Sequence, residues 1–246
     1  MAFTFIASAV GGDDDAGTTS DTTTSFNVAA GDVLVAWVKS EGAPTTVAVA
    51  DTGGTNALTF DAGDVENHSN GDLSTAWGYR LIAQANATAT FRLTTQSRPF
   101  RTLIMWQFRP DAAETITKDA SNVSQGSGTT MSSGNISTTG DDEIVLGGYG
   151  EYVGNNSANH QINGVAATGV VQASGIIPNF TASWYRILAA TFTNGQATCT
   201  NNSSDWICGI IAIKSGGAAP AAGTSSPLVP QGVLGSPPLV GGMLAM

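Results

Sequence analysis

The chain has little charge and few of the side chains on which nucleic-acid-binding proteins and most enzymes depend. Of its 246 residues, 11% are Asp, Glu, Lys or Arg, and the net charge is -10. The nine Lys and Arg residues are scattered. Because phosphate binding needs clustered cations, nucleic acid is not expected as a partner. No apolar run approaches the roughly 20 residues of a membrane-spanning helix, so no membrane span is predicted.

The first residues, MAFTFIASAVGG, only partly imitate a secretory signal. No basic residue precedes the apolar run, and the run is about the shortest that a signal peptide allows. We therefore predict an N-terminal strand or arm over residues 1–19, without an export signal.

Cysteine and histidine are also scarce. Cys199 and Cys208 match no zinc motif, and their spacing leaves two alternatives open: a disulfide across a hairpin, or two small buried thiols. His68 and His160 stand among Asn, Ser and Gly, which predicts exposed loop positions. No serine lies in a nucleophile elbow. The sequence therefore predicts no catalytic residue, and the protein is not expected to be an enzyme.

Acidic residues occur in short clusters. Asp13, Asp14 and Asp15 form the better candidate site for Ca²⁺, which prefers carboxylate oxygens, and no other cofactor is predicted. A second cluster, Asp141–Glu143, stands where a turn is expected, which favours a structural role. The acids of region 61–72 are expected to be loop residues rather than the carboxylate pair of a glycosidase.

What the sequence does contain is the pattern of an all-β protein. It has 30 Gly, much Thr, Ser and Asn, and short apolar runs that alternate with polar residues. Val33–Lys39 reads as a strand after a turn. Two further strands, TATFRLTTQ and RTLIMWQFR, are predicted to pair through a connection at Ser97–Phe100. All five tryptophans stand in apolar strand contexts, and core positions are expected for them. Tyr152 is the aromatic residue most expected to be exposed and available to a ligand.

The second prominent pattern is an internal repeat with a period of about 107 residues, much longer than that of a solenoid. Trp77, Tyr79, Arg80, Leu81 and Ala83 align with Trp184, Tyr185, Arg186, Ile187 and Ala189 when one gap is allowed. Downstream, Ala89–Phe91 aligns with Ala197–Cys199, and Leu103–Trp106 with Gly209–Ala212. We expect an antiparallel β-sandwich of two repeated units, either packed face to face as one sandwich or forming two tandem sandwiches.

The repeat sets the expected boundaries along the chain. The first unit is predicted over 20–110, a polar connector over 111–133 and the second unit over 134–215. A Gly/Ala/Pro linker follows over 216–224 and precedes an extended, irregular C-terminal arm at 225–246.

The shared elements resemble β-sandwich, jelly-roll-like domains of tailed-phage virion proteins and bacterial surface proteins. The residues that carry the resemblance are Gly31–Val35, Trp77–Ala83, Ala87–Phe91 and Leu103–Phe108, with Gly140–Leu146, Trp184–Ala190 and Ile207–Ile213 in the second copy. The resemblance covers roughly residues 20–215 and implies a sandwich fold. For function it implies decoration, cement or fibre-like subunits of a virion, which are often trimers, or carbohydrate-binding and adhesive modules.

The segment SSPLVPQGVLGSPPLVGGMLAM is apolar, uncharged and broken by Pro and Gly. Its aliphatic side chains are expected to bind a partner: Leu228, Val229, Val233, Leu234, Leu239, Val240, Met243 and Leu244. These observations predict a structural protein of a tailed-phage virion, assembled in the host cytoplasm and exposed on the particle. It would be a homo-oligomer attached through this arm to a major capsid or tail protein. The alternative is a carbohydrate-binding or adhesive module of a phage tail or bacterial surface protein.

Overall fold

The computed structural model describes residues 3–13, 20–23, 25–42, 46–95, 100–111, 114–151, 157–173 and 180–218. The strands are β1 (Phe3–Asp13), β2 (Ser20–Thr22), β3 (Phe26–Val28), β4 (Val33–Glu41), β5 (Val47–Asp51), β6 (Val65–Asn67), β7 (Leu73–Arg80), β8 (Asn86–Ala89), β9 (Phe91–Thr95), β10 (Arg101–Pro110), β11 (Glu114–Ser132), β12 (Glu143–Glu151), β13 (Ala158–Ile162), β14 (Val165–Ala166), β15 (Gly169–Ala173), β16 (Thr181–Leu188) and β17 (Ala197–Ala218). A 3₁₀ turn, η1 (Ala62–Asp64), precedes β6. The prediction of an all-β protein is confirmed, and the first residues do form a strand.

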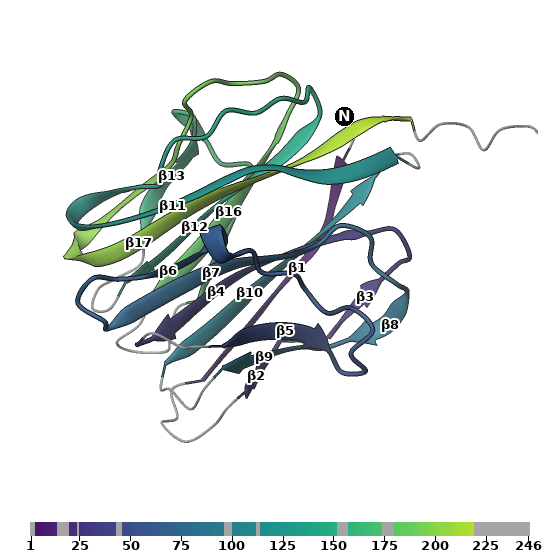
Figure 1. The fold of residues 1–246 in the computed structure, drawn as a ribbon, viewed down its shortest axis with the longest axis horizontal. Coiled ribbons are helices and arrows are strands. Elements are labelled where there is room, and N and C mark those ends of the chain that lie inside the picture. The colour runs from purple at the N-terminus through teal and green to yellow at the C-terminus, as the bar shows by residue number, and fades with distance from the viewer. Residues whose placement is uncertain are drawn as a thin grey trace, which may run out of the picture.

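Two large antiparallel sheets form the centre of the molecule (Figure 1). The first sheet has the order β1-β10-β4-β7-β6. The second has the order β14-β13-β17-β12-β16-β15, and β11 also pairs with β17. Two small sheets, β2-β9-β5 and β3-β8, cover the outer face of the first sheet. The expected antiparallel β-sandwich is therefore present.

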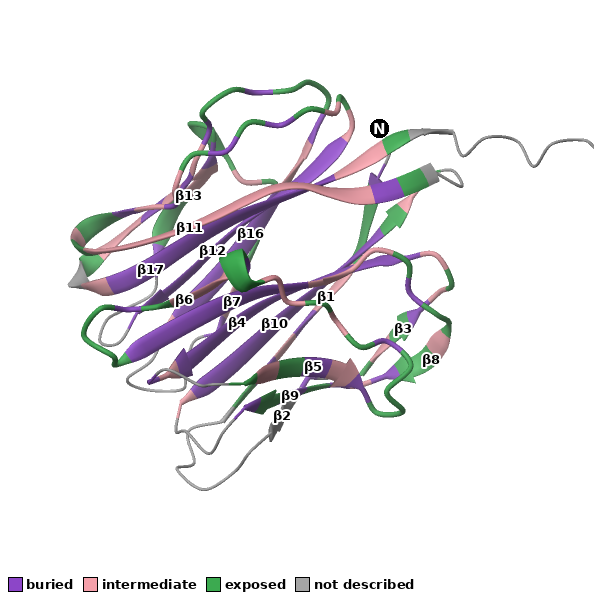
Figure 2. Cartoon of the chain, viewed as in Figure 1, coloured by how far each residue is buried: buried purple, intermediate pink, exposed green. Residues whose placement is uncertain are grey.

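Three apolar cores hold these layers together. The central core joins the inner faces of both large sheets and includes Val35, Trp106 and Leu146. A second core lies between the first sheet and the small sheets, and a third covers the outer face of the second sheet. The middle strands are therefore buried on both faces, as the continuous purple of β4, β10 and β12 in Figure 2 shows. This double burial explains why their sequences are unbroken apolar runs, a pattern more usual in parallel sheets.

Tryptophans of the first sheet fit into glycine positions of the second. A Cβ atom on Gly148 or Gly209 would collide with the indoles of Trp37 and Trp77, so only glycine leaves room for them. The Trp37 indole N–H also crosses the core to the Thr181 hydroxyl at 3.0 Å. A second indole, that of Trp106, donates to Ser183 Oγ at 2.9 Å. All five tryptophans are buried, as the sequence predicts.

The polar stretch predicted as a connector, 111–133, is largely strand β11. It pairs along its length with β17, and the register of the ladder shifts at Gly128, whose φ is +111°. At this point the ribbon of β11 and β17 folds over the second sheet: the thiol of Cys208 lies 3.6 Å from the Ala197 carbonyl, whereas a straight strand would separate these residues by about 35 Å. β11 has a polar sequence because it is an outer strand of its sheet and few of its side chains, Ile116, Ala120, Val123 and Met131, pack on the cores.

The predicted pair of β9 and β10 does not exist as a pair. β9 lies between β2 and β5 in a small sheet, whereas β10 lies between β1 and β4 in the first sheet. Consecutive strands therefore belong to different layers. Each layer buries its own apolar side chains, so an alternating pattern alone could not distinguish the two arrangements.

The strand orders of the large sheets correspond. The first sheet reads β1-β10-β4-β7-β6, and part of the second reads β11-β17-β12-β16-β15. The ladders make the pair Val35–Tyr79 equivalent to Leu146–Tyr185, with all four side chains in or against the central core. Trp77 and Trp184, which the sequence aligns, lie on opposite faces of their sheets, because neither ladder contains a bulge at the expected gap. The duplication itself stays a prediction.

Candidate functional site

The two large sheets meet along two long sides of very different character. On one side, β11 of the second sheet lies beside β6 and η1 of the first. Lys118 of β11 binds Asp61 Oδ2 at 2.5 Å and Asp64 Oδ2 at 2.7 Å, and its ammonium lies 5.5 Å from the Tyr79 ring centroid. Hydrogen bonds and the charge of Lys118 keep the pKa of Asp61 below its usual value. We call this side the polar side.

Uncharged groups continue the polar side. The Gln125 amide donates to Glu66 Oε1 at 2.7 Å, and its oxygen accepts the Ser69 amide at 2.6 Å. Farther along, the Asn70 amide donates to Asp205 Oδ2 at 2.9 Å. The acids of region 61–72 are thus partly engaged in joining the two sheets, and Asp61 and Asp64 converge on one lysine rather than facing each other across a cleft.

The opposite side is apolar, and we call it the apolar edge. It is formed by Phe5 and Ile6 on β1, the outermost strand of the first sheet, which lies near β15, the outermost strand of the second. A β-bulge between Phe5 and Ala7 makes Ile6 an extra residue in the ladder. The Phe5 ring stacks on Tyr185 with centroids 5.2 Å apart, yet Phe5 stays 36% exposed and Ile6 37%.

No described strand pairs with the outer edge of β1. One end of this edge lies near the last described residue. Phe3 pairs with Pro110, and the Thr4 hydroxyl donates to Asp111 at 3.1 Å. Shortly after, Glu114 pairs with Ala218, the last residue of β17. Figure 1 shows the N-terminus beside this end of β17. The sequence that follows Ala218 therefore starts close to the beginning of the apolar edge.

A buried carboxylate precedes the first central strand of each large sheet. Asp32 stands before Val33, which pairs with Phe108, and Arg109 follows. Asp32 accepts hydrogen bonds from the Ala29 amide at 2.8 Å, the Gln107 side chain at 2.5 Å and Arg109 Nε at 2.8 Å. The Asp32 carboxylate therefore closes a turn and binds one guanidinium. Its hydrogen bond and negative charge raise the pKa of Arg109.

The equivalent corner of the second sheet contains two carboxyls. Glu143 stands before Ile144 and accepts the Gly140 amide at 2.6 Å, the same three-residue turn that Asp32 closes. Asp119 accepts Lys214 Nζ at 2.7 Å and the Thr139 amide at 2.6 Å. Burial and the neighbouring Asp119 raise the pKa of Glu143 to about 7, although the Gly140 amide opposes this shift. The turn role predicted for this acidic cluster agrees with the Glu143–Gly140 bond.

Near one end of the central core lies a buried lysine. Lys39 on β4 is fully buried and packs against Gly150 and Thr75. Burial lowers its pKa to about 7, while the carboxylates of Glu41 and Glu151 act in the opposite direction. The sequence offered no signal for this cluster beyond a lysine inside an apolar run.

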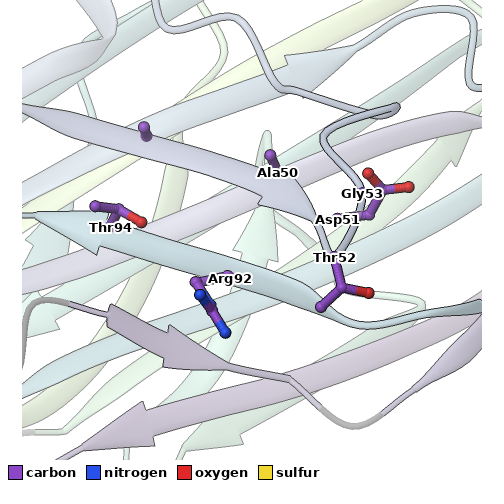
Figure 3. A pocket seen from close by; sticks show the side chains of 7 residues that line it. Ala50, Asp51, Thr52, Gly53, Arg92 and Thr94 are labelled. Atoms are coloured by element: carbon purple, nitrogen blue, oxygen red, sulfur yellow. The ribbon is translucent and has the colours of Figure 1, made fainter.

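A shallow pocket of about 380 Å³ lies on the outer small sheet. Figure 3 shows Arg92 and Thr94 on β9 beside Ala50 on β5, with Thr52 and Gly53 at the turn that follows. Asp51 at its rim is held by amide groups of Asn56 and Asn86, at 3.0 and 2.9 Å. Burial alone would raise the pKa of Asp51, but these bonds lower it. Arg92 is therefore the cation that the pocket presents to solvent.

Another open pocket, of about 350 Å³, lies at the end of β7. Its lining includes Thr59, Tyr79 and the exposed Ile82. Arg80 also lines it and donates to the Ala57 carbonyl at 3.4 Å. Arg186, with which Arg80 aligns in the predicted repeat, donates to the Ile162 carbonyl at 3.1 Å. Both arginines thus hold neighbouring backbone.

Ser157 and His160 form the closest match to a nucleophile and base. Ser157 Oγ lies 2.7 Å from His160 Nε2, and the imidazole packs on Trp184 at 4.9 Å between centroids. Burial lowers the pKa of His160 to about 4, which makes it a weak base at neutral pH. The prediction of exposed loop histidines is wrong: His160 lies on β13, and His68 is buried.

Several predicted site residues cannot be compared with the structure. Asp14, Asp15, Tyr152 and the arm residues 225–246 lie outside the described residues, as does the side chain of Asp13, which ends β1. Cys199 and Cys208 are free, buried thiols, so the second of the two alternatives applies.

Within the described ranges, no group of three or more His, Cys, Asp or Glu could hold a metal ion. In the same ranges no helix has the length and apolar character to cross a membrane. Comparison with family models, curated proteins and solved structures found no match.

Proposed function

We propose that this chain is a structural subunit of a tailed-phage virion, a decoration, cement or fibre-like protein that attaches through its C-terminal arm. The observation that carries the proposal is the position of the apolar edge. The strand β1, whose outer edge no described strand pairs, begins near Ala218, after which the sequence continues toward the apolar segment 225–246. An exposed apolar edge and an apolar segment in the same chain favour association with other subunits.

The polar clusters support a structural rather than a catalytic role. Lys118 and Gln125 join the two sheets, and Asp32 and Glu143 close equivalent turns within them. These polar side chains therefore hold the sheets and the turns in place. A subunit exposed on a particle needs such internal cross-links, because it must keep its shape while its contacts bear force.

The test is to locate the protein in particles. Particles released from cells that carry the gene are separated on a density gradient and analysed by mass spectrometry. We expect peptides of this chain in the virion fraction for the full chain. A version truncated before Ser225 should fold, with an unchanged circular dichroism spectrum, but should be lost from that fraction. Recovery of the full chain only among free host proteins would contradict the proposal.

A second candidate function, carbohydrate binding by an adhesive module, is favoured by the pocket beside Arg92. A guanidinium beside a threonine hydroxyl and small residues suits an acidic sugar. Binding of the full chain to an array of acidic glycans, lost in Arg92→Ala, would support this function. An array with no signal above background would exclude it for the glycans displayed.

A further inference from the structure

We propose that the apolar edge of one copy takes the C-terminal segment of a neighbouring copy as an added strand, so that copies are linked arm to edge. This inference rests on the proposed function and names the partner of the arm: a second copy of the same chain. Addition of an extended segment to a free sheet edge is an established mode of recognition, in which backbone hydrogen bonds supply affinity and side-chain contacts supply specificity.

The edge strand has the features that this mode requires. The outer side of β1 carries backbone groups that no described strand pairs, over a strand of 11 residues. Natural edges are often protected by a charged side chain that points inward. Here the exposed positions are instead Phe5 and Ile6, and the Phe5 ring rests on Trp106, Phe108 and Tyr185. An incoming aliphatic side chain would pack on the exposed part of Phe5, which these buried rings hold in place.

The arm has the matching composition. Leu239–Met246 contains no proline, so each of its amides can donate to a neighbouring strand, and it carries four of the predicted partner-binding aliphatic residues. Four prolines interrupt the upstream part, where only short paired stretches are possible: Pro227, Pro230, Pro237 and Pro238. The bulge at Ile6 interrupts the receiving edge in the same way. Short apolar stretches of the C-terminal segment thus match the edge of β1, which the bulge divides into short parts.

Length favours a neighbouring copy over the chain's own edge. The 11 residues of β1 span about 36 Å, whereas residues 225–246, if extended, reach about 70 Å. One edge therefore accommodates roughly half of the arm. The other half is long enough to bridge the distance from its own sandwich to the next.

The bulge also argues against the simplest competing partner, the same edge of another copy. Two β1 strands pairing with each other would need a regular, flat ladder, and the extra residue at Ile6 twists the strand out of that register. A separate arm with proline breaks can adapt to the bulge, whereas a second copy of the bulged strand would have to match it.

The experiment compares oligomeric state by sedimentation velocity for the full chain, the chain truncated before Ser225, Ile6→Asp and Val165→Asp. Val165 is the matched control, because it is 50% exposed and lies on β14. We expect oligomers for the full chain and for Val165→Asp, and monomers for the truncated chain and Ile6→Asp. Circular dichroism and thermal unfolding establish that every variant is folded.

A second measurement isolates the contact itself. A labelled peptide of residues 225–246 with a charged solubility tag is titrated onto the truncated chain. We expect saturable binding that weakens at least tenfold in Ile6→Asp and stays within twofold in Val165→Asp. Equal binding to all three proteins would overturn the assignment of the arm to this edge.

The possible outcomes separate this inference from the proposed function. Oligomers that are lost on truncation but survive Ile6→Asp would place the arm elsewhere and leave the proposed function standing. A monomeric full chain whose β1 amides exchange more slowly than those of the truncated chain would show the arm on its own edge, which overturns the link between copies. Virion incorporation that is unaffected by truncation would defeat the proposed function itself.

Discussion

The two corners at which the large sheets begin solve the same problem with different chemistry. Asp32 and Glu143 occupy equivalent positions, and each accepts the backbone amide three residues earlier. Asp32 is bound directly by Arg109, whereas in the second corner Lys214 binds Asp119, and Glu143 lies beside that carboxyl. Where two carboxyls lie side by side, as Glu143 and Asp119 do, one of them avoids the repulsion by retaining a proton to higher pH. The second corner is therefore expected to respond to pH through Glu143.

The largest loss of stability is expected from replacing Asp32 in the first corner. Asp32→Ala removes a fully buried acceptor, leaves the Ala29 amide without its partner and takes one of the two acceptors of the Gln107 amide. Loss of a buried charged acceptor should lower the free energy of unfolding by about 3 kcal/mol. Urea unfolding followed by tryptophan fluorescence measures this loss. Asp111→Ala, at an exposed site, is the control; a loss below about 1 kcal/mol for Asp32→Ala would contradict the account.

A smaller and pH-dependent effect is expected at the second corner. The pKa of Glu143 is raised in the folded protein to about 7, so the stability that its proton contributes is complete below about pH 4.5 and is lost as the pH rises through 7. Glu143→Gln keeps the acceptor for Gly140 and mimics the protonated form. The variant should therefore gain on the order of 2 kcal/mol over the parent between pH 5 and 8.5.

The difference between parent and variant is the quantity to measure, because other groups titrate in the same range. His160, whose pKa is lowered to about 4, makes stability rise from about pH 4 to 6.5, and Lys39, lowered to about 7, makes it rise above pH 7. Subtracting the two urea-unfolding profiles removes both contributions. A difference that stays constant with pH would show that Glu143 does not titrate in this range.

The smallest effects should come from the two cations. Arg109 is 48% exposed and Lys214 is 30% exposed, whereas the acids that they bind are buried. Arg109→Met is expected to cost about 1 kcal/mol, because the Ala29 amide and Gln107 still hold Asp32. Lys214→Met should lower the free energy of unfolding by no more than Arg109→Met at pH 5, where Glu143 holds its proton. The loss should be distinctly larger at pH 8. Equal costs for Lys214→Met at both pH values would remove the distinction between the corners.

How far the sequence leads can be judged from particular residues. The all-β class and the burial of the tryptophans follow from local patterns, because alternation and apolar runs are local properties. The layer to which a strand belongs is not local, which is why β9 and β10 were predicted as a pair and β11 as a connector. Glu143 was recognised as part of an acidic turn, but its partners Asp119 and Lys214 come from β11 and β17 and have no spacing that identifies them. The apolar edge was missed because Phe5 and Ile6 look like any core residues.

The pairing of β17 on both of its edges also determines how the molecule would respond to force. The sequence continues from this strand into the arm, and β17 is paired with β11 on one side and β12 on the other. A pull on its C-terminal end would act along the strand and across these hydrogen bonds, which are perpendicular to it, so many would have to fail together rather than one after another. The indoles of Trp37 and Trp77, which pack against Gly148 and Gly209, would resist sliding of the sheets in the same direction. The C-terminal end of β17, from which the predicted arm would continue, is thus a place in the fold that can carry tension.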